Sequence, residues 1–250
     1  MIRVRPVRIA KGGEISNRCF PIEDEVSNYI QFVELTKSHD IELHKLLTLI
    51  CCSGVRITEA LNSFILHDIT KNRYYLRCIA LKRKKITKFE FSKERAMHEK
   101  ELMKLLITKP QAFKTMPLLN LFKLDVSDIL ENVNDVDEPI RKWKPFTIDF
   151  KKRRYDEFFR SLKNAYTTLN MRFRVYYLES KLSGIVKTVE IVPSFHFYRK
   201  LFVSELYKRT RDITASVEYM KWSKLERLLD YSKAYEIEKL EEKFDISNLA

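Results

Sequence analysis

The chain has 250 residues, of which 45% are hydrophobic and 32% are charged, a composition typical of a globular protein rather than a disordered one. Its 47 lysines and arginines outnumber its 34 acids, and the net charge of +13 favours a polyanionic partner such as nucleic acid. No apolar run approaches the roughly 18 residues of a membrane-spanning helix, and the N-terminus lacks the apolar core of a secretory signal. We therefore expect a soluble, cytoplasmic protein with no membrane partner.

Cysteine and glycine usage excludes several kinds of chemistry. Cys19, Cys51, Cys52 and Cys78 show no C-x-x-C spacing and no accompanying histidine pattern, which predicts a reducing compartment, no disulfide framework and no metal site. Cys51 and Cys52 lie in the apolar run LLTLICC, where we expect them to be buried. Only four glycines occur, so a glycine-rich phosphate loop of either common type is excluded. We therefore expect no cofactor, no metal and no use of ATP.

The first third of the chain predicts a basic arm followed by three helices. Residues 1–20 carry five basic residues and one acid, which indicates an arm or a linker. A helix is expected over 21–35, where the early proline and acids suit a first turn. The apolar segment 41–52 predicts a central core helix, which Gly54 ends. A further helix is expected over 55–64.

The next segments predict a hairpin, a helix and a surface loop. Two β-rich runs, 74–79 and 86–91, are separated by basic residues, which is typical of a hairpin. A helix is expected near 94–107. The stretch 124–139 contains six acids and no base, and we interpret it as a surface excursion.

The remaining segments predict further helices. Over 151–169 the sequence KKRRYDEFFRSLKNAYTTL places apolar residues on one helical stripe, and its all-basic first turn opposes the helix dipole. A phosphate bound there would relieve the conflict. The chain from 195 onward is again helical. These patterns together predict an α+β fold, mostly α, with one small antiparallel sheet. The residues that we expect to bind DNA directly are Arg83, Lys151, Lys152, Arg153 and Arg154.

Cutting DNA without a metal sets three chemical requirements. A nucleophile must attack phosphorus, cations must neutralise the two non-bridging oxygens, and an acid must protonate the leaving 5′ oxygen. Arginine suits the oxygens, because its planar guanidinium donates two hydrogen bonds and stays charged. Lysine suits the acid, and tyrosine suits the nucleophile, because a phenolate leaves well when the strand is resealed.

The sequence contains such a set in a recognisable order. SGVRITEAL, residues 53–61, resembles the first arginine box of the tyrosine recombinase (phage integrase) family, which usually reads T-G-x-R-x-x-E-L. The resemblance implies that Arg56 is the first phosphate clamp and that Glu59, one turn later, orients the site. The segment before this box is similar to the helices that precede it in the family.

Downstream boxes extend the resemblance. FHFYRKLF resembles the second family box, H-x-x-R, which implies that Arg199 is the second clamp. His196 would then donate a hydrogen bond to phosphate or shuttle a proton, although it could also be structural. Trp222 stands where the family has His or Trp. Tyr231 follows nine residues later, at the family's usual spacing to the nucleophile, so the resemblance implies that it attacks the phosphate.

Two assignments keep alternatives. The basic turn LKRKK lies where the family carries its catalytic lysine, and Lys82 is our choice. Lys84 and Lys85 compete with it, because a slip in strand register changes which side chain points inward. Tyr235 competes with Tyr231, and the nine-residue spacing favours Tyr231.

The resemblance implies a helical catalytic domain of the tyrosine recombinase type over 21–250. Arg56 and His196 lie 140 positions apart, further than the family usually needs, so about 120–180 could be an insertion. The tail, about 236–250, carries an amphipathic strip that either packs on its own domain or docks on a neighbouring protomer.

The implied activity is that of a site-specific recombinase or integrase of a mobile genetic element. It would cleave and rejoin double-stranded DNA through a 3′-phosphotyrosyl intermediate, and it would self-associate as a tetramer on paired sites. One alternative is a type IB topoisomerase, which uses a similar residue set but relaxes supercoils as a monomer. Another is a DNA-binding protein that retains the fold without cleaving.

Overall fold

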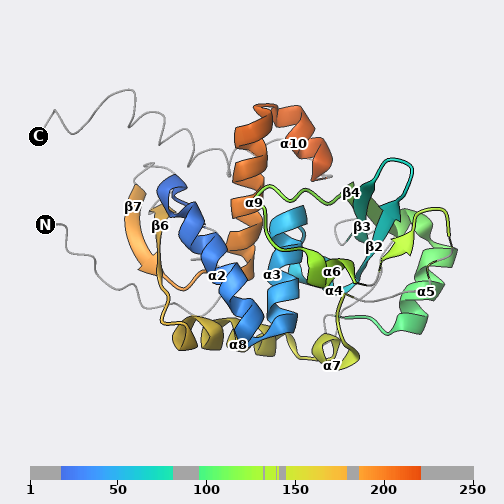
Figure 1. The fold of residues 1–250 in the computed structure, drawn as a ribbon, viewed down its shortest axis with the longest axis horizontal. Coiled ribbons are helices and arrows are strands. Elements are labelled where there is room, and N and C mark those ends of the chain that lie inside the picture. The colour runs from blue at the N-terminus through green and yellow to red at the C-terminus, as the bar shows by residue number, and fades with distance from the viewer. Residues whose placement is uncertain are drawn as a thin grey trace, which may run out of the picture. The chain divides into compact units, whose positions relative to one another are not determined.

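The computed structural model describes residues 18–80, 96–131, 133–138, 140, 145–178 and 186–220 (Figure 1). It divides into two compact units, each with its own sheet. The middle unit runs from Ile30 to Met171, and the terminal unit combines residues up to Tyr29 with residues from Arg172 onward. The α+β, mostly helical class is confirmed, but the expectation of a single sheet was wrong.

The middle unit is built around one buried helix. Its elements are most of α2 (Val26–His39), then α3 (Ile41–Ser53), α4 (Ile57–Leu61), β2 (Ser63–Asp68), β3 (Arg73–Ile79), α5 (Glu99–Thr108), η2 (Pro110–Ala112), β4 (Phe113–Pro117), α6 (Ser127–Leu130), β5 (Asn134–Asp135), α7 (Ile148–Lys151) and α8 (Tyr155–Thr168). The buried helix is α3, as its apolar sequence predicts. The Asp40 carboxylate caps its N-terminus by accepting the N–H groups of Glu42 and Leu43. Gly54 ends it in the left-handed conformation, with φ of 63°, which a residue with a Cβ adopts only at a cost.

Helix α8 belongs to this core. Phe158 and Leu162 are buried along its predicted stripe, and α8 packs against α3. The Tyr166 ring stacks on that of Phe32 in α2, with ring centroids 3.9 Å apart and planes 4° from parallel. The segment read from the sequence as a possible insertion therefore supplies part of the core of the middle unit.

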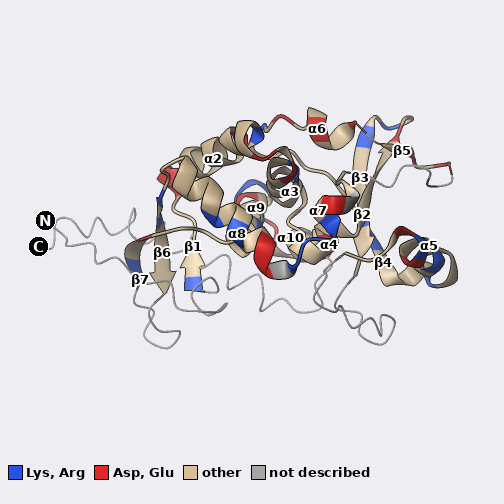
Figure 2. Ribbon diagram, turned by 90° about the horizontal axis from the view of Figure 1, so that it is seen from below, with Lys and Arg blue, Asp and Glu red and all other residues tan. Residues whose placement is uncertain are grey.

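The start of α8 differs from the prediction. The helix begins at Tyr155, so the four basic residues 151–154 precede its first turn rather than form it. The first turn carries Asp156 and Glu157 instead, and Figure 2 shows the colour of acidic residues near the label of α8. Acids there stabilise the positive end of the helix dipole, so the conflict expected from the sequence does not arise.

The four-stranded sheet has the order β4-β3-β2-β5. β3 pairs antiparallel with β2 on one edge and with β4 on the other. A described strand therefore lies on each edge of β3. Residues 86–91, which were predicted to form a hairpin with 74–79, lie outside the described ranges. An apolar cluster that includes Phe64, Leu102 and Phe113 packs α5 against one face of the sheet.

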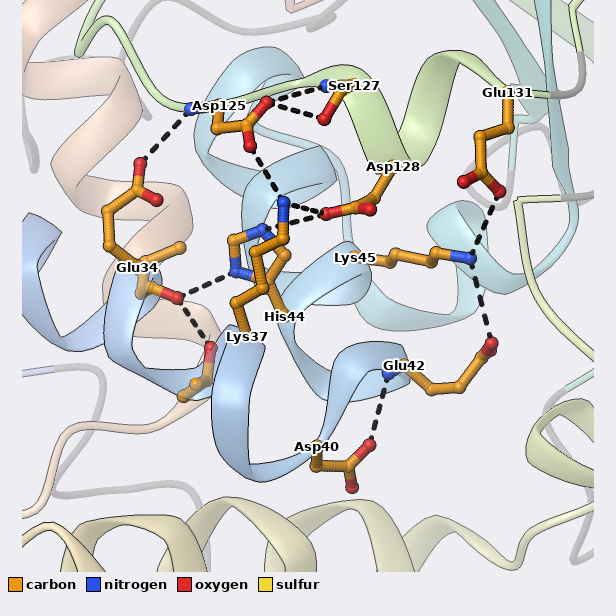
Figure 3. Close-up of polar contacts among 12 residues, drawn as sticks. Glu34, Lys37, Asp40, Glu42, His44, Lys45, Asp125, Ser127, Asp128 and Glu131 are labelled. Carbon is orange, nitrogen blue, oxygen red and sulfur yellow. Dashed lines mark hydrogen bonds and ion pairs between the residues drawn. The ribbon is translucent and has the colours of Figure 1, made fainter.

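The acidic stretch after β4 is not a simple surface excursion. Its β5 pairs in parallel with β2, and Ile129 of α6 is buried. Figure 3 shows how ion pairs attach it to α2: Lys37 Nζ lies 2.8 Å from Asp125 and 2.8 Å from Asp128. The Asp125 N–H also donates to Glu34. Asp125 and Asp128 are thus matched by a base from elsewhere in the chain, which local composition does not reveal.

The described part of the terminal unit holds an antiparallel sheet of order β1-β6-β7. Its elements are β1 (Cys19–Phe20), η1 (Glu23–Glu25), the start of α2, β6 (Phe173–Leu178), β7 (Val186–Ile191), α9 (Phe195–Thr210) and α10 (Ile213–Tyr219). The Tyr29 hydroxyl donates to the Arg174 carbonyl at 2.6 Å, and the Arg174 Nε donates to Glu25 at 2.6 Å. These bonds join the first turns of α2 to β6.

Cys51 and Cys52 are buried, as predicted. All four cysteines fall within the described ranges, all are buried, and none forms a disulfide. Burial raises the pKa of the Cys52 thiol to about 12 and that of Cys19 to about 11. Both thiols are therefore protonated at neutral pH and pack as small apolar side chains.

Removing the Tyr166 ring tests whether α8 is part of the core. Tyr166→Ala should lower the free energy of unfolding of the chain by about 3 kcal/mol, because it empties a buried ring site. Lys163→Ala, an exposed change on the same helix, is the control and should shift it by less than about 0.5 kcal/mol. Urea unfolding measures both. Equal values for the two variants would contradict the packing described here.

The ion pairs of Asp125 predict a dependence of stability on pH. Hydrogen bonds from Lys37 and Ser127 hold the pKa of Asp125 well below its usual range. A depressed carboxyl pKa stabilises the fold above the unfolded-state value of about 3.9, and this contribution is lost as pH falls toward the folded-state value. The difference in urea midpoint between the wild type and Asp125→Asn should therefore shrink on acidification below pH of about 4. A constant difference would contradict the assignment.

Candidate functional site

The first arginine box forms the start of α4. Arg56 is the N-cap residue, with extended backbone (φ −79°, ψ 155°), directly after the turn that Gly54 makes. Its backbone N–H donates to Glu59 Oε2 at 2.9 Å. Glu59 therefore satisfies one N–H at the start of the helix, as the glutamate of a capping box does. The three-residue spacing of the motif places both residues on one helical turn.

A lysine from the sheet completes this cluster. Lys114 on β4 lies opposite Cys78 of β3, and its Nζ is 3.2 Å from Glu59 Oε1. The same oxygen lies 3.5 Å from Arg56 Nη1. One carboxylate thus contacts two cations from different elements. We call Arg56, Glu59 and Lys114 the cationic cluster.

Burial separates the roles of the three side chains. The exposed fraction is 2% for Glu59 and 6% for Lys114, but 30% for Arg56. A buried ion pair loses its hydration, and breaking it leaves an uncompensated charge in the interior. Arg56 is the member that solvent reaches, so an anion would meet its guanidinium first. A guanidinium binds the oxygens of a phosphate through paired hydrogen bonds.

Lys114 was not identified from the sequence. No strand was predicted over 113–117, and one lysine in the run FKTMP carries no motif. The strand alternation offers the only local signal, since Lys114 shares a face with Met116, which is 1% exposed. A buried lysine needs an acid nearby, because an unpaired charge in the interior is costly. Only the tertiary structure identifies Glu59 as that acid.

The second box lies on α9, in the terminal unit. His196 and Arg199 occupy the first turns of this helix, three residues apart and therefore on one face. His196 is half-buried, whereas Arg199 is 1% exposed and is among the largest fully buried side chains. An arginine stays charged when buried, so this position keeps a positive charge within the described part of α9.

The neighbouring Lys200 has a structural role. Its Nζ donates to the Cys19 carbonyl at 2.7 Å and lies 4.1 Å from the centroid of the Phe20 ring. These contacts fasten α9 to β1. The two adjacent cations of the second box are therefore not equivalent, because the contacts of Lys200 attach α9 to the sheet.

The basic segment 151–154 is engaged largely within the chain. Arg153 Nη1 donates to the Ser161 hydroxyl at 3.2 Å and lies 3.6 Å from Asp40, and its guanidinium lies over the Phe150 ring. Arg154 pairs with Asp156 at 3.4 Å, and Lys151 is buried. Lys152 is exposed. DNA binding by these four residues stays a prediction.

The other predicted site residues lie outside the described residues. They are the proposed nucleophile and its alternative, Tyr231 and Tyr235, the indole Trp222, and the basic turn with Lys82, Arg83, Lys84 and Lys85. The arm over 1–17 and the tail over 236–250 lie outside them too. Of the predicted catalytic set, the structure describes Arg56, Glu59, His196 and Arg199.

Comparison of the sequence with protein-family profiles and with curated proteins finds no match. Among solved structures, the chain is similar to the XerH site-specific recombinase bound to a palindromic difH substrate in a post-cleavage complex, with a TM-score of 0.49 and 13% sequence identity. The similarity covers 97% of this chain and 56% of that one, so this chain spans just over half the length of that recombinase. Within the described ranges, no helix is both long and apolar enough to cross a membrane. The function has to be inferred from the residues and their geometry.

Neutralising Glu59 tests the cationic cluster. Glu59→Gln should lower the free energy of unfolding by about 3 kcal/mol, because it leaves Lys114 buried without its counter-charge. Asp68→Asn is the matched control: Asp68 pairs with Lys71 at the same 3.2 Å, but that lysine is 64% exposed. Its effect should be much smaller. Urea unfolding compares the two, and equal losses would show that Glu59 is not held as described.

Proposed function

We propose that this chain cleaves and rejoins DNA as a site-specific recombinase or integrase of the tyrosine recombinase type. The observation that carries the proposal is the geometry of the first arginine box. Glu59 is buried and holds Arg56 at the start of α4, while the Arg56 guanidinium stays partly open to solvent. A fixed guanidinium that a phosphate can reach is what the first clamp of this chemistry requires.

The second box supports the same chemistry. Arg199 and His196 share one face of α9. Arg199 is 1% exposed, so its contact with a phosphate requires the side chains that cover it to move when DNA binds. The burial of Arg199 shields its charge from bulk water, which strengthens its interaction with an anion. An arginine that pairs with a phosphate through two hydrogen bonds neutralises charge on its non-bridging oxygens. Electrostatic stabilisation of this kind is commonly the largest part of catalysis.

The proposed reaction needs no metal in its steps. The Tyr231 phenol loses its proton to solvent as its oxygen attacks the phosphorus, the bond to the 5′ oxygen breaks, and that oxygen takes a proton from Lys82, which solvent then reprotonates. Arg56 and Arg199 stabilise the charge on the non-bridging oxygens, and His196 donates a hydrogen bond to one of them. The product is a 3′-phosphotyrosyl linkage and a 5′ hydroxyl. Attack by a 5′ hydroxyl on this linkage restores the phosphodiester and releases the tyrosine.

The proposed partner is double-stranded DNA. The net charge of +13 attracts the phosphate backbone, and most non-specific affinity for DNA arises this way. Trp222 takes the position that His or Trp holds in the family, where it would donate a hydrogen bond to the phosphate. We propose that four protomers act on two paired sites, as integration of a mobile genetic element requires.

Trapping the covalent adduct tests the nucleophile. The substrate is a nicked duplex whose short cleaved fragment diffuses away, so that the adduct accumulates and is seen as a slower band on a denaturing gel. Wild type and Tyr235→Phe should form the adduct, and Tyr231→Phe should not, because it lacks the attacking oxygen. Loss of the adduct in Tyr235→Phe alone would move the nucleophile to Tyr235. Adduct in both variants would overturn the mechanism.

Plasmid substrates distinguish the remaining functions. A recombinase exchanges strands only between paired sites, whereas a type IB topoisomerase relaxes a plain supercoiled plasmid without them. Relaxation at a rate independent of any site would favour the topoisomerase. DNA binding with no adduct under any of these conditions would favour a non-cleaving protein that retains the fold.

A further inference from the structure

We propose that Lys114 is a positioning residue for phosphate binding, acting on Arg56 through Glu59. The inference rests on the proposed function, in which Arg56 contacts a DNA phosphate. Lys114 lies 58 positions after Arg56 in the chain and reaches the cluster only because β4 pairs with β3. Its Nζ lies 3.2 Å from Glu59 Oε1, the oxygen that also faces the Arg56 guanidinium.

The sign of the cationic cluster depends on Lys114. With Arg56 and Lys114 charged and Glu59 ionised, the cluster carries a formal charge of +1. Without the lysine, Glu59 and Arg56 would neutralise each other and leave no net charge to attract an anion. Lys114 therefore allows a carboxylate to orient the arginine without cancelling its charge.

The geometry gives the three groups different tasks. Glu59 Oε2 accepts the Arg56 N–H at 2.9 Å, which fixes the rotation of the carboxylate, while Oε1 faces both cations. Lys114 is the nearer cation and the more buried one, so it dominates the pairing. Arg56, at 3.5 Å from the same oxygen and 30% exposed, leaves part of its guanidinium accessible to a ligand.

Burial also excludes a direct role for Lys114. Its side chain is 6% exposed, and its neighbours on the strand face include Met116 and Cys78, both buried. A DNA backbone cannot enter that apolar interior, because phosphate would lose its hydration there. Any effect of Lys114 on DNA must therefore pass through Glu59 and Arg56.

The chain offers a matched control in the same sheet. Lys71, in the turn between β2 and β3, pairs with Asp68 at 3.2 Å, the distance found for Lys114 and Glu59. Its side chain is 64% exposed and it is not part of the cationic cluster. Lys71→Met therefore removes the same charge and the same kind of ion pair as Lys114→Met, without touching Arg56.

A double-mutant cycle on DNA binding tests the inference. The affinity for a short labelled duplex is measured by fluorescence anisotropy for the wild type, Arg56→Ala, Lys114→Met and the double variant. Each single change should weaken binding about tenfold, and the double should be no weaker than Arg56→Ala alone. Both singles and the double should each lower the slope of log affinity against log salt by about one, because one phosphate contact is lost. Lys71→Met should instead lower the affinity for DNA by the same small factor in the wild type and in Arg56→Ala.

Additive effects on affinity would overturn the inference. Lys114→Met would then weaken DNA binding by the same factor whether residue 56 is arginine or alanine. An effect of Lys114→Met no larger than that of Lys71→Met would overturn it as well. DNA affinity is compared only among variants that are folded, as shown by a folded baseline in their urea unfolding curves. If Lys114→Met lacks one, Lys114→Gln replaces it, because glutamine keeps a donor for Glu59 while removing the charge. Lys114→Arg, which restores the charge, should recover affinity to within a few-fold of the wild type, and failure to do so counts against the inference.

The covalent adduct assay, run on the same proteins, separates this inference from the proposed function. A wild type that binds DNA but forms no adduct would overturn the proposed cleavage activity. The double-mutant cycle on DNA affinity would still test whether Lys114 positions Arg56. With cleavage intact, Lys114→Met should slow adduct formation at saturating DNA by about tenfold, because a misplaced arginine stabilises the transition state poorly. A wild type with no affinity for DNA would overturn both.

Discussion

The buried carboxylate of Glu59 is the contact on which the candidate site depends. One of its oxygens accepts a backbone N–H at the start of α4, and the other faces a lysine from β4. A carboxylate in the interior is tolerated only when its charge is matched and its lone pairs are occupied. Here the matching cation comes from the sheet, so the position of Arg56 depends on the strand pairing as well as on the helix. The Glu59 side chain thus links the start of α4, strand β4 and the Arg56 guanidinium.

The two arginine boxes solve the same electrostatic problem differently. Both lie at helix starts, where the dipole disfavours a cation. In α4, the acid Glu59 follows Arg56 within one turn and offsets the conflict locally. In α9, the first turn has no acid, and Arg199 is placed in a buried region of the helix. A phosphate bound at either helix start would be favoured by the dipole as well as by the arginine.

In the middle unit, the segment of about 120–180 that the motif spacing suggested to be an insertion contributes to the core. The acidic stretch is matched by Lys37 and contributes a strand to the sheet, and α8 contributes Tyr166 to an aromatic stack. Long spacing between motifs therefore does not by itself indicate a dispensable insertion. In the basic run 151–154, Arg153 pairs with Asp40 and lies over the Phe150 ring, and Arg154 pairs with Asp156, so a run of cations can also have contacts within its own unit.

Local sequence determined the helices and the contents of each motif. The apolar segment of α3, capped by Asp40 and ended by Gly54, could be recognised because capping and periodicity act within a few residues. The closeness of Arg56 and Glu59 followed from helical spacing alone. Only the tertiary structure decided that β3 pairs with β2 and β4, that β5 joins the sheet, and that Lys114 meets Glu59. Strand pairing and buried ion pairs join residues far apart in the chain. The sequence of a strand does not by itself show which other strand it will pair with.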